Sequence, residues 1–262
     1  MDEEALTRAL KDTSIFAVRA LAETGSTNDV ALQWIDAGAE DLSLVIADRQ
    51  TQGRGRLHRT WVTEPDASLA FSLILKPTVV EAAAPSALFA PMCGLAVATA
   101  LEKRYSLYPQ IKWPNDVLLE RQKCCGILVE AAWSGSQLAG IVLGIGINIQ
   151  AGALPAGTTT RFPATWIEKY TRQSVDRFEL LAEVLKQLAA WRGQIGSDLF
   201  FREWERRLAF RGEIIRVEES EKSSIIGTEY GVDSTGALLV QSSDGIQHRI
   251  EVGDVHLSPT QA

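Results

Sequence analysis

Residues 123–148 read KCCGILVEAAWSGSQLAGIVLGIGIN and contain two apolar runs, Gly126–Trp133 and Gln137–Leu143. The turn Trp133-Ser-Gly-Ser136 lies between them, and Gly and Ser are typical turn residues. Two strand-length runs around a short turn predict an antiparallel β-hairpin. Gly144-Ile-Gly-Ile-Asn148 extends the second run and places two glycines on one strand face, where another backbone can cross closely.

Further strand-like and helical runs precede the hairpin. We expect strands at residues 16–22, 42–47, 68–75 and around 117–119, and helices at 3–10, 29–37 and 86–104. Ser26 or Thr27 would cap the helix at 29–37. The runs do not alternate strictly between strand and helix, which favours a mixed or antiparallel sheet over a doubly wound one. The predicted fold class is therefore α+β, with a mixed sheet packed against helices.

The composition changes near residue 208. Residues 176–207 are predicted to be helical with a break near 193–197, and short β-rich runs separated by Asp, Ser and Gly turns follow at 214–217, 225–230, 237–241 and 246–252. Strands at this spacing predict a small β-barrel. We therefore predict two domains, residues 1–207 and residues 208–262, and call the second the C-terminal module.

The charge balance excludes some classes of partner. The 262 residues include 26 Lys and Arg against 33 Asp and Glu, a formal net charge of −7. Polymeric nucleic acid and anionic membranes need a basic surface, so we expect neither DNA nor membrane as a partner. The C-terminal module holds four basic and nine acidic residues, a balance of −5, so most of the net charge of −7 lies there.

The cysteines and the N-terminus indicate the compartment. The chain has three cysteines and no CxxC spacing, which does not fit a disulfide framework or a metal site. The N-terminus MDEEALTRAL lacks a basic and apolar signal pattern, and the longest apolar stretch, residues 138–149, is shorter than the roughly twenty residues of a membrane span. We expect a soluble, cytoplasmic protein with reduced thiols.

Residues 49–61, RQTQGRGRLHRTW, form an Arg-rich loop with no acidic residue. Glycines let backbone N–H groups approach an anion, and arginine supplies a planar fork for phosphate or carboxylate. An anion-binding loop and a merely solvated basic loop both fit this composition. RGG-like RNA binding has weak support in an acidic chain. A GxxxxGK[ST] motif is absent, and a GxGxxG frame from Gly53 meets His58 in place of its last glycine.

Lys112-Trp-Pro-Asn-Asp116 forms a predicted turn, because Pro114 forces its predecessor toward an extended conformation. Asp116 fits a turn-capping acid as well as a functional one, and Lys123 fits a surface lysine. Lys123, however, opens the apolar run KCCGILVEA, where a buried ammonium group requires an anionic partner.

Five short motifs together resemble the biotin–protein ligases, the biotin–[acetyl-CoA carboxylase] ligase or BirA-like family. They are, in chain order, Thr24-Gly-Ser-Thr-Asn28; Gln50 with Gly53-Arg-Gly-Arg56 and Trp61; Lys112-Trp-Pro-Asn-Asp116; Lys123-x-x-Gly-Ile-Leu-x-Glu130; and Gly144-x-Gly-x-Asn148. The resemblance implies a class II synthetase-like, biotin–lipoate ligase fold followed by an SH3-like module, in agreement with the predicted β-rich tail.

The resemblance also implies a two-step ligase. Biotin attacks the α-phosphorus of ATP, bound with Mg²⁺, to give biotinyl-5′-AMP and pyrophosphate. A lysine of a biotin carboxyl carrier protein, an acetyl-CoA carboxylase subunit or a related carrier domain, then takes the biotinyl group. Bringing a carboxylate onto a triphosphate requires fixed positive charge, and a neutral ureido ring requires hydrogen-bonding groups.

The family's site maps onto matching positions of this chain. The implied catalytic residues are Lys123, Arg56 and Asp116, and no metal ligand is assigned. The implied residues for biotin and adenylate binding are Ser26, Thr27, Asn28, Gln50, Gly53, Arg54, Gly55, Arg56, Trp61, Lys112, Asn115, Lys123, Gly126, Gly144, Gly146 and Asn148. Trp166 fits either a family tryptophan near the adenine or an ordinary core aromatic.

Two departures from the family pattern carry expectations. His58 stands where the family loop commonly has glycine, which restricts the loop backbone while Arg54 and Arg56 remain. Only 23 residues precede Thr24, so we expect a monofunctional ligase without the DNA-binding repressor domain of two-domain relatives. A lipoate ligase or lipoyl transferase and a non-catalytic biotin sensor stay open as alternatives, and so does the choice between monomer and homodimer.

Overall fold

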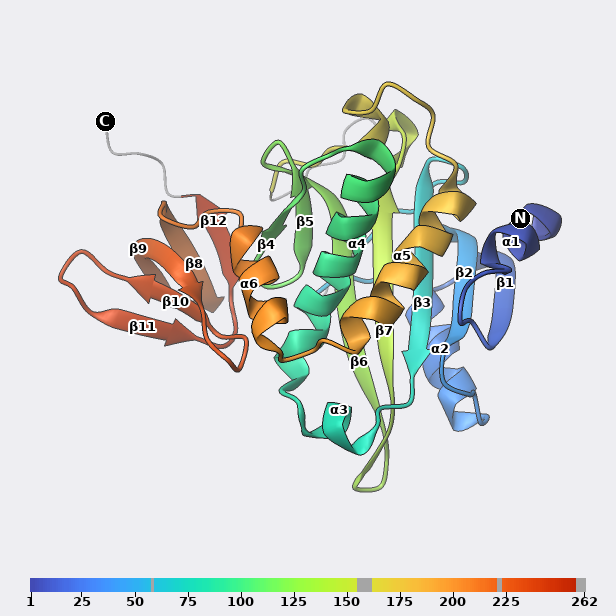
Figure 1. The fold of residues 1–262 in the computed structure, drawn as a ribbon, viewed down its shortest axis with the longest axis horizontal. Coiled ribbons are helices and arrows are strands. Elements are labelled where there is room, and N and C mark those ends of the chain that lie inside the picture. The colour runs from blue at the N-terminus through green and yellow to red at the C-terminus, as the bar shows by residue number, and fades with distance from the viewer. Residues whose placement is uncertain (58, 155–161, 221–222, 258–262) are drawn as a thin grey trace.

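The computed structural model describes residues 1–262 apart from residues 58, 155–161, 221–222 and 258–262 (Figure 1). Within these residues, seven strands form one sheet in the order β1-β2-β3-β7-β6-β5-β4. Only β1 and β2 pair in parallel, which confirms the predicted mixed sheet. The strands are β1 (Ala17–Thr24), β2 (Ser43–Gln50), β3 (Ser68–Leu75), β4 (Gln110–Lys112), β5 (Asp116–Leu119), β6 (Gln122–Ser134) and β7 (Gln137–Asn148).

The predicted hairpin is the centre of this sheet. β6 and β7 pair antiparallel from Cys125 opposite Ile147 to Ser134 opposite Gln137, and both strands are longer than their apolar runs. β4 was not predicted, because its three residues show no periodic pattern of their own.

Helices cover the two faces of the sheet unequally (Figure 1). On one face, α4 and α5 pack over the large apolar core. On the other face, α2 packs over β2, β3 and β7 with a smaller apolar cluster. The helices are α1 (Glu3–Leu10), α2 (Thr27–Asp36), α3 (Val79–Ala83), α4 (Phe89–Tyr105), α5 (Arg177–Arg192) and α6 (Asp198–Arg206), with short 3₁₀ turns at η1 (Ser86–Leu88), η2 (Ala151–Ala153) and η3 (Ile167–Lys169).

Beyond the reach of α2, small residues form the surface of this second face. Side chains alternate between faces along a strand, so Gly144 and Gly146 share the face of Val142, which packs against α2. The pairing register puts Gly126 of β6 opposite Gly146, and Ser72 of β3 opposite Gly144. The face therefore has space above the sheet at its centre.

The C-terminal module contains a second, antiparallel sheet of order β11-β10-β9-β8-β12. Its strands are β8 (Ile214–Ser220), β9 (Ser223–Val232), β10 (Leu238–Gln241), β11 (Gln247–Ile250) and β12 (Asp254–Leu257). An SH3-like description fits, but β11 and β12 are opposite edges of the described sheet, so the predicted barrel is not closed by a strand pair. β12 was not predicted, because a run of four residues with only two apolar positions is too short to give a clear strand pattern.

Backbone and side-chain bonds join the module to the first sheet. Ile111 of β4 accepts a bond from Ala209 N (3.0 Å) and donates to Arg207 O (2.6 Å), so the chain leaving α6 runs beside the sheet edge. The indole N–H of Trp113 donates to Gly236 O of the module at 3.0 Å. The boundary between residues 207 and 208 stays a prediction. Among the described residues, no helix is long and apolar enough to cross a membrane.

Candidate functional site

A cavity of about 500 Å³ lies on the glycine-lined face of the sheet. It gathers residues from all five sequence motifs. The predicted site residues that line it are Ser26, Thr27, Asn28, Gln50, Arg54, Gly55, Arg56, Trp61, Lys112, Asn115, Asp116, Lys123, Gly126, Gly144, Gly146 and Asn148. Gly53 does not line the cavity, and its role is local: a Cβ there would lie 2.3 Å from the Trp61 carbonyl oxygen.

The Arg-rich loop folds back on itself beside the cavity. Trp61 N donates to Gly53 O (2.8 Å), and Gly55 N donates to Arg59 O (2.7 Å). Arg54 and Thr60 form an antiparallel bridge between these two bonds. The loop is thus a short hairpin whose side chains point to several walls of the site. His58 lies outside the described residues.

A polar cluster at the start of α2 forms one end of the cavity. Gln50 Oε1 accepts from Thr27 N (2.8 Å) and Thr27 Oγ1 (3.0 Å), and Ser72 Oγ donates to Asn28 Oδ1 (2.6 Å). These bonds fix the amide and hydroxyl groups before any ligand contacts them. Ser26 occupies the N-cap position, but its side chain makes no capping bond and it borders the cavity.

Three glycines, Gly126, Gly144 and Gly146, form a ledge along the cavity floor. A Cβ on Gly146 would lie 2.3 Å from Trp61 Cε2, and one on Gly126 would lie 2.9 Å from Trp61 Cζ3. A Cβ on Gly144 would lie 2.2 Å from Asn28 Oδ1. The indole N–H of Trp61 is buried and has no hydrogen-bond partner among the described residues.

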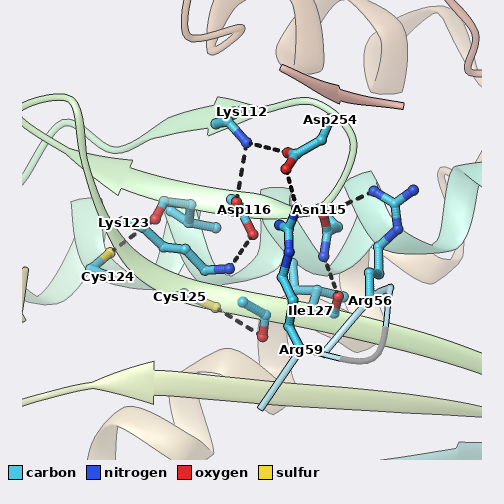
Figure 2. Close-up of polar contacts among 12 residues, drawn as sticks. Arg56, Arg59, Lys112, Asn115, Asp116, Lys123, Cys124, Cys125, Ile127 and Asp254 are labelled. Atoms are coloured by element: carbon cyan, nitrogen blue, oxygen red, sulfur yellow. Dashed lines mark hydrogen bonds and ion pairs between the residues drawn. The ribbon is translucent and has the colours of Figure 1, made fainter. Parts of the chain in front are cut away.

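Five alternating charges form a chain through the opposite end of the cavity (Figure 2). Lys123 Nζ lies 2.6 Å from Asp116 Oδ1, and Asp116 Oδ2 lies 3.4 Å from Lys112 Nζ. Lys112 Nζ also lies 3.0 Å from Asp254 Oδ1, and Asp254 Oδ2 accepts from Arg59. This charge chain runs from β6 through β5 and β4 to β12 and back to the Arg-rich loop. It confirms the expectation that Lys123 has an anionic partner.

Both acids of the charge chain stay ionised near neutral pH. Burial alone would raise the pKa of the Asp116 carboxyl, but the ammonium groups of Lys123 and Lys112 lower it below its usual value. Burial is likewise outweighed at Asp254, where Lys112 and Arg59 lower the carboxyl pKa. Lys112 is only 2% exposed, and these two carboxylates are the anionic partners that compensate for the burial of its ammonium group.

Arg56 and Asn115 join the loop to the sheet beside the charge chain. Asn115 Nδ2 donates to Ile127 O (2.6 Å), and Arg56 Nη1 donates to Asn115 Oδ1 (3.3 Å) and to Gly253 O (3.4 Å). Figure 2 shows both side chains close to the charge chain. The C-terminal module therefore contacts two arginines of the loop, Arg56 through Gly253 and Arg59 through Asp254.

The model of the biotin/lipoate A/B protein ligase family matches residues 21–148, and that of the biotin protein ligase C-terminal domain matches residues 211–258. The biotin–[acetyl-CoA-carboxylase] ligase of Paracoccus denitrificans is 34% identical over 236 residues, which are 87% of this chain and 95% of the relative. The chain belongs to the biotin–protein ligase family. The ligase of the same name from Mycobacterium tuberculosis is 29% identical and covers 95% of the chain and 94% of its own length.

Solved structures of biotin–protein ligases have the same fold. The ligase from Aquifex aeolicus in complex with biotin and ATP superimposes with a TM-score of 0.79 at 28% identity. The match covers 93% of this chain and 99% of that chain. A match of this extent includes most of the C-terminal module as well as the first sheet.

Sequence reasoning missed several residues of the biotin–protein ligase site. Asp254 is the most informative, because it lies 142 positions after Lys112 and no local pattern connects the two. Phe71, Phe162 and Ala164 also line the cavity. Trp166 does not line it and packs instead under Lys169, whose Nζ lies 5.6 Å from the ring centroid.

We expect Asp254→Asn to lower the free energy of unfolding by about 3 kcal/mol at pH 7, because Lys112 would lose a buried partner. A depressed pKa contributes stability above the unfolded-state value of about 3.9 and loses it as the pH falls through the folded-state value. The difference between wild type and variant should therefore shrink below about pH 4. Urea denaturation at a series of pH values measures it.

Glu251→Gln is the matched control for this substitution. Glu251 lies in the same segment and is exposed, and among the described residues its ion-pair partner is Arg249 alone, so its loss should cost less than about 1 kcal/mol. Equal losses in the two variants would show that Asp254 is no more than a surface charge.

Proposed function

We propose that this chain activates biotin with ATP as biotinyl-5′-AMP and transfers the biotinyl group to a lysine of a biotin carboxyl carrier protein. One observation carries the proposal: a single cavity joins a neutral polar cluster, a glycine ledge and a chain of alternating charges with a cation, Lys123 or Arg59, at each end. Biotin carries matching groups in the same order along its length: a neutral ureido ring, an apolar chain and a carboxylate. The similarity to the Aquifex aeolicus ligase in complex with biotin and ATP supports this assignment.

The ureido ring would lie at the start of α2. Thr27 already donates to Gln50, and Ser72 bonds to both Thr27 and Asn28, so these residues shape this end of the cavity. Ser26 retains a hydroxyl for the ligand, and the buried indole N–H of Trp61 is a donor in need of an acceptor. The glycine ledge lets the Trp61 ring lie close to the sheet, and the flat ring system and apolar chain of biotin would pack beside this ring.

The first step takes place at the cationic end. A carboxylate oxygen of biotin forms a bond to the α-phosphorus of ATP, the bond from that phosphorus to the β-phosphate bridging oxygen breaks, and pyrophosphate leaves. Lys123 lies at the inner end of the charge chain and is 24% exposed, so its ammonium can reach both reacting anions. Arg56 adds a second positive charge from the loop. Preorganised charge of this kind stabilises the negative charge that accumulates in the transition state.

The second step transfers the acyl group. The carrier amine, in its neutral form, attacks the biotinyl carbonyl carbon, the bond to the phosphate oxygen breaks, AMP leaves and the amine gives up a proton to water. Asp116 is a weak base for that proton, because the pKa of its carboxyl is lowered by two lysines. We assign Asp116 to holding Lys112 and Lys123 in place.

Magnesium enters this scheme as part of the substrate Mg·ATP. Among the described residues, no group of three or more His, Cys, Asp and Glu side chains is placed to hold a metal ion. The carboxylates lining the cavity, Asp116 and Asp254, are already ion-paired. Mg²⁺ bound largely by phosphates and water is consistent with this wall. The cytoplasmic location and the homodimer stay predictions.

We expect Lys123→Ala to lower the rate of pyrophosphate release with biotin and Mg·ATP by about 10²–10³-fold, the usual loss when one charge-stabilising donor is removed. The melting temperature should change little, because Lys123 is partly exposed. A coupled pyrophosphate assay and thermal denaturation measure the two effects.

Lys103→Ala, an exposed lysine on α4 far from the motifs, is the control and should keep wild-type activity. The wild-type assay also separates the alternatives. Transfer of lipoate but not biotin to an apo-carrier domain would favour a lipoate ligase, and binding of biotin without pyrophosphate release would indicate a sensor.

The glycine ledge gives a second expectation. Gly146→Ala should weaken biotin binding about tenfold, because the added methyl group would push the Trp61 ring off the ledge. Isothermal titration with biotin measures the affinity. Gly193→Ala is the matched control, since its nearest neighbour is Ala190 O at 3.7 Å and its φ of −70° suits alanine. Unchanged affinity in Gly146→Ala would place biotin elsewhere in the cavity.

A further inference from the structure

Glu130 ends the motif that begins at Lys123, yet no part of the reaction described above uses it. It lies on β6 opposite Val142, on the same face as the cavity and beside the start of α2. Its side chain is 24% exposed and does not line the cavity. The role of this carboxylate therefore has to be inferred from the groups that it binds.

Both oxygens of Glu130 bind the guanidinium group of Arg54. Arg54 Nη1 donates to Oε1 at 2.9 Å and Nη2 donates to Oε2 at 2.8 Å, which is the two-point geometry of a strong ion pair. Arg54 Nη2 also donates to Asp29 Oδ1 at 2.6 Å. Arg54 lies at the base of the loop hairpin, because its backbone forms a β-bridge with Thr60.

Glu130 also orients Asn28. Asn28 Nδ2 donates to Glu130 Oε2 at 2.7 Å and to Leu128 O at 3.3 Å, while Asn28 Oδ1 accepts from Ser72. The amide is 4% exposed and its orientation is fixed from both sides. The Glu130 carboxylate therefore contacts both the base of the Arg-rich loop and the polar cluster at the start of α2.

We propose that Glu130 is a positioning residue that fixes the Arg-rich loop and the biotin-side polar cluster relative to each other, and that Arg54 is the anchor of the loop. This inference rests on the proposed function, since it concerns the retention of the adenylate. Arg56 and Arg59 then remain as the arginines that face the charge chain and the C-terminal module.

The charges on both sides of Arg54 favour an anchor over a phosphate ligand. Moving Arg54 onto a phosphate would leave Asp29 and Glu130 close together without a shared cation, and would remove a two-point ion pair. Lysine cannot make the same planar two-point contact. An anchor therefore predicts that Arg54→Lys fails to restore function, whereas a simple phosphate-binding charge predicts that it succeeds.

The experiment is a double-mutant cycle on the full chain. Glu130→Ala, Arg54→Ala and the double variant are compared for the KM of biotin, the kcat of pyrophosphate release, and the rate at which biotinyl-5′-AMP formed on the enzyme is released. We expect Arg54→Ala to release the adenylate about tenfold faster than wild type and Glu130→Ala at least as fast, because Glu130 also holds Asn28. The double variant should match Glu130→Ala alone, because that variant has already lost the contact with Arg54. Multiplied effects, near a hundredfold in the double variant, would overturn the proposal.

Further variants separate positioning from folding. Glu130→Gln keeps the size of the side chain and should give an intermediate release rate with an unchanged melting temperature. Glu23→Ala is the control, because Glu23 is exposed and, within the described part of the chain, forms an ion pair with Arg49 alone. Wild-type release rates in both Glu130 variants would also overturn the proposal. Absence of pyrophosphate release in wild type would instead refute the proposed ligase activity itself.

Discussion

The burial of Lys112 is the constraint on which the site depends. An ammonium group that is 2% exposed needs carboxylates on both sides, and it obtains Asp116 from the first sheet and Asp254 from the C-terminal module. Asp116 then holds Lys123, and Asp254 holds Arg59. The buried ammonium group of Lys112 thus holds Lys123, the Arg-rich loop and the C-terminal module in one arrangement.

The glycine ledge is the apolar counterpart of that constraint. Sheets of this kind normally bury large side chains under a helix, but here α2 covers only part of its face, and small residues open the rest. The space created is occupied from above by Trp61 and at one end by Asn28. The cavity therefore exists because these strand positions carry no large side chain. Its floor is the backbone of the sheet, which is hydrogen-bonded on both sides.

The local parts of the site could be predicted from sequence, and the long-range partners could not. The β6–β7 hairpin, the shared face of Gly144 and Gly146, and the anionic partner of Lys123 all follow from spacing and burial within a few residues. Asp254 and its strand β12 escaped prediction, because a short alternating run after a turn has no distinctive pattern. The contact of Arg54 with Glu130 escaped for another reason: an arginine beside glycines fits an anion site and a protein carboxylate equally well. The remaining predicted roles depend on ligands and await the measurements.

The strand-like pairing of residues 207–209 with β4 has a mechanical meaning. Segments that connect two folded units usually act as hinges, because few contacts cross them. Here the connection is hydrogen-bonded to the edge of the first sheet, and Trp113 is bonded to the second unit only two residues after Ile111. The module is thereby held against the first sheet, so Gly253 and Asp254 contact Arg56 and Arg59 of the Arg-rich loop from a fixed position.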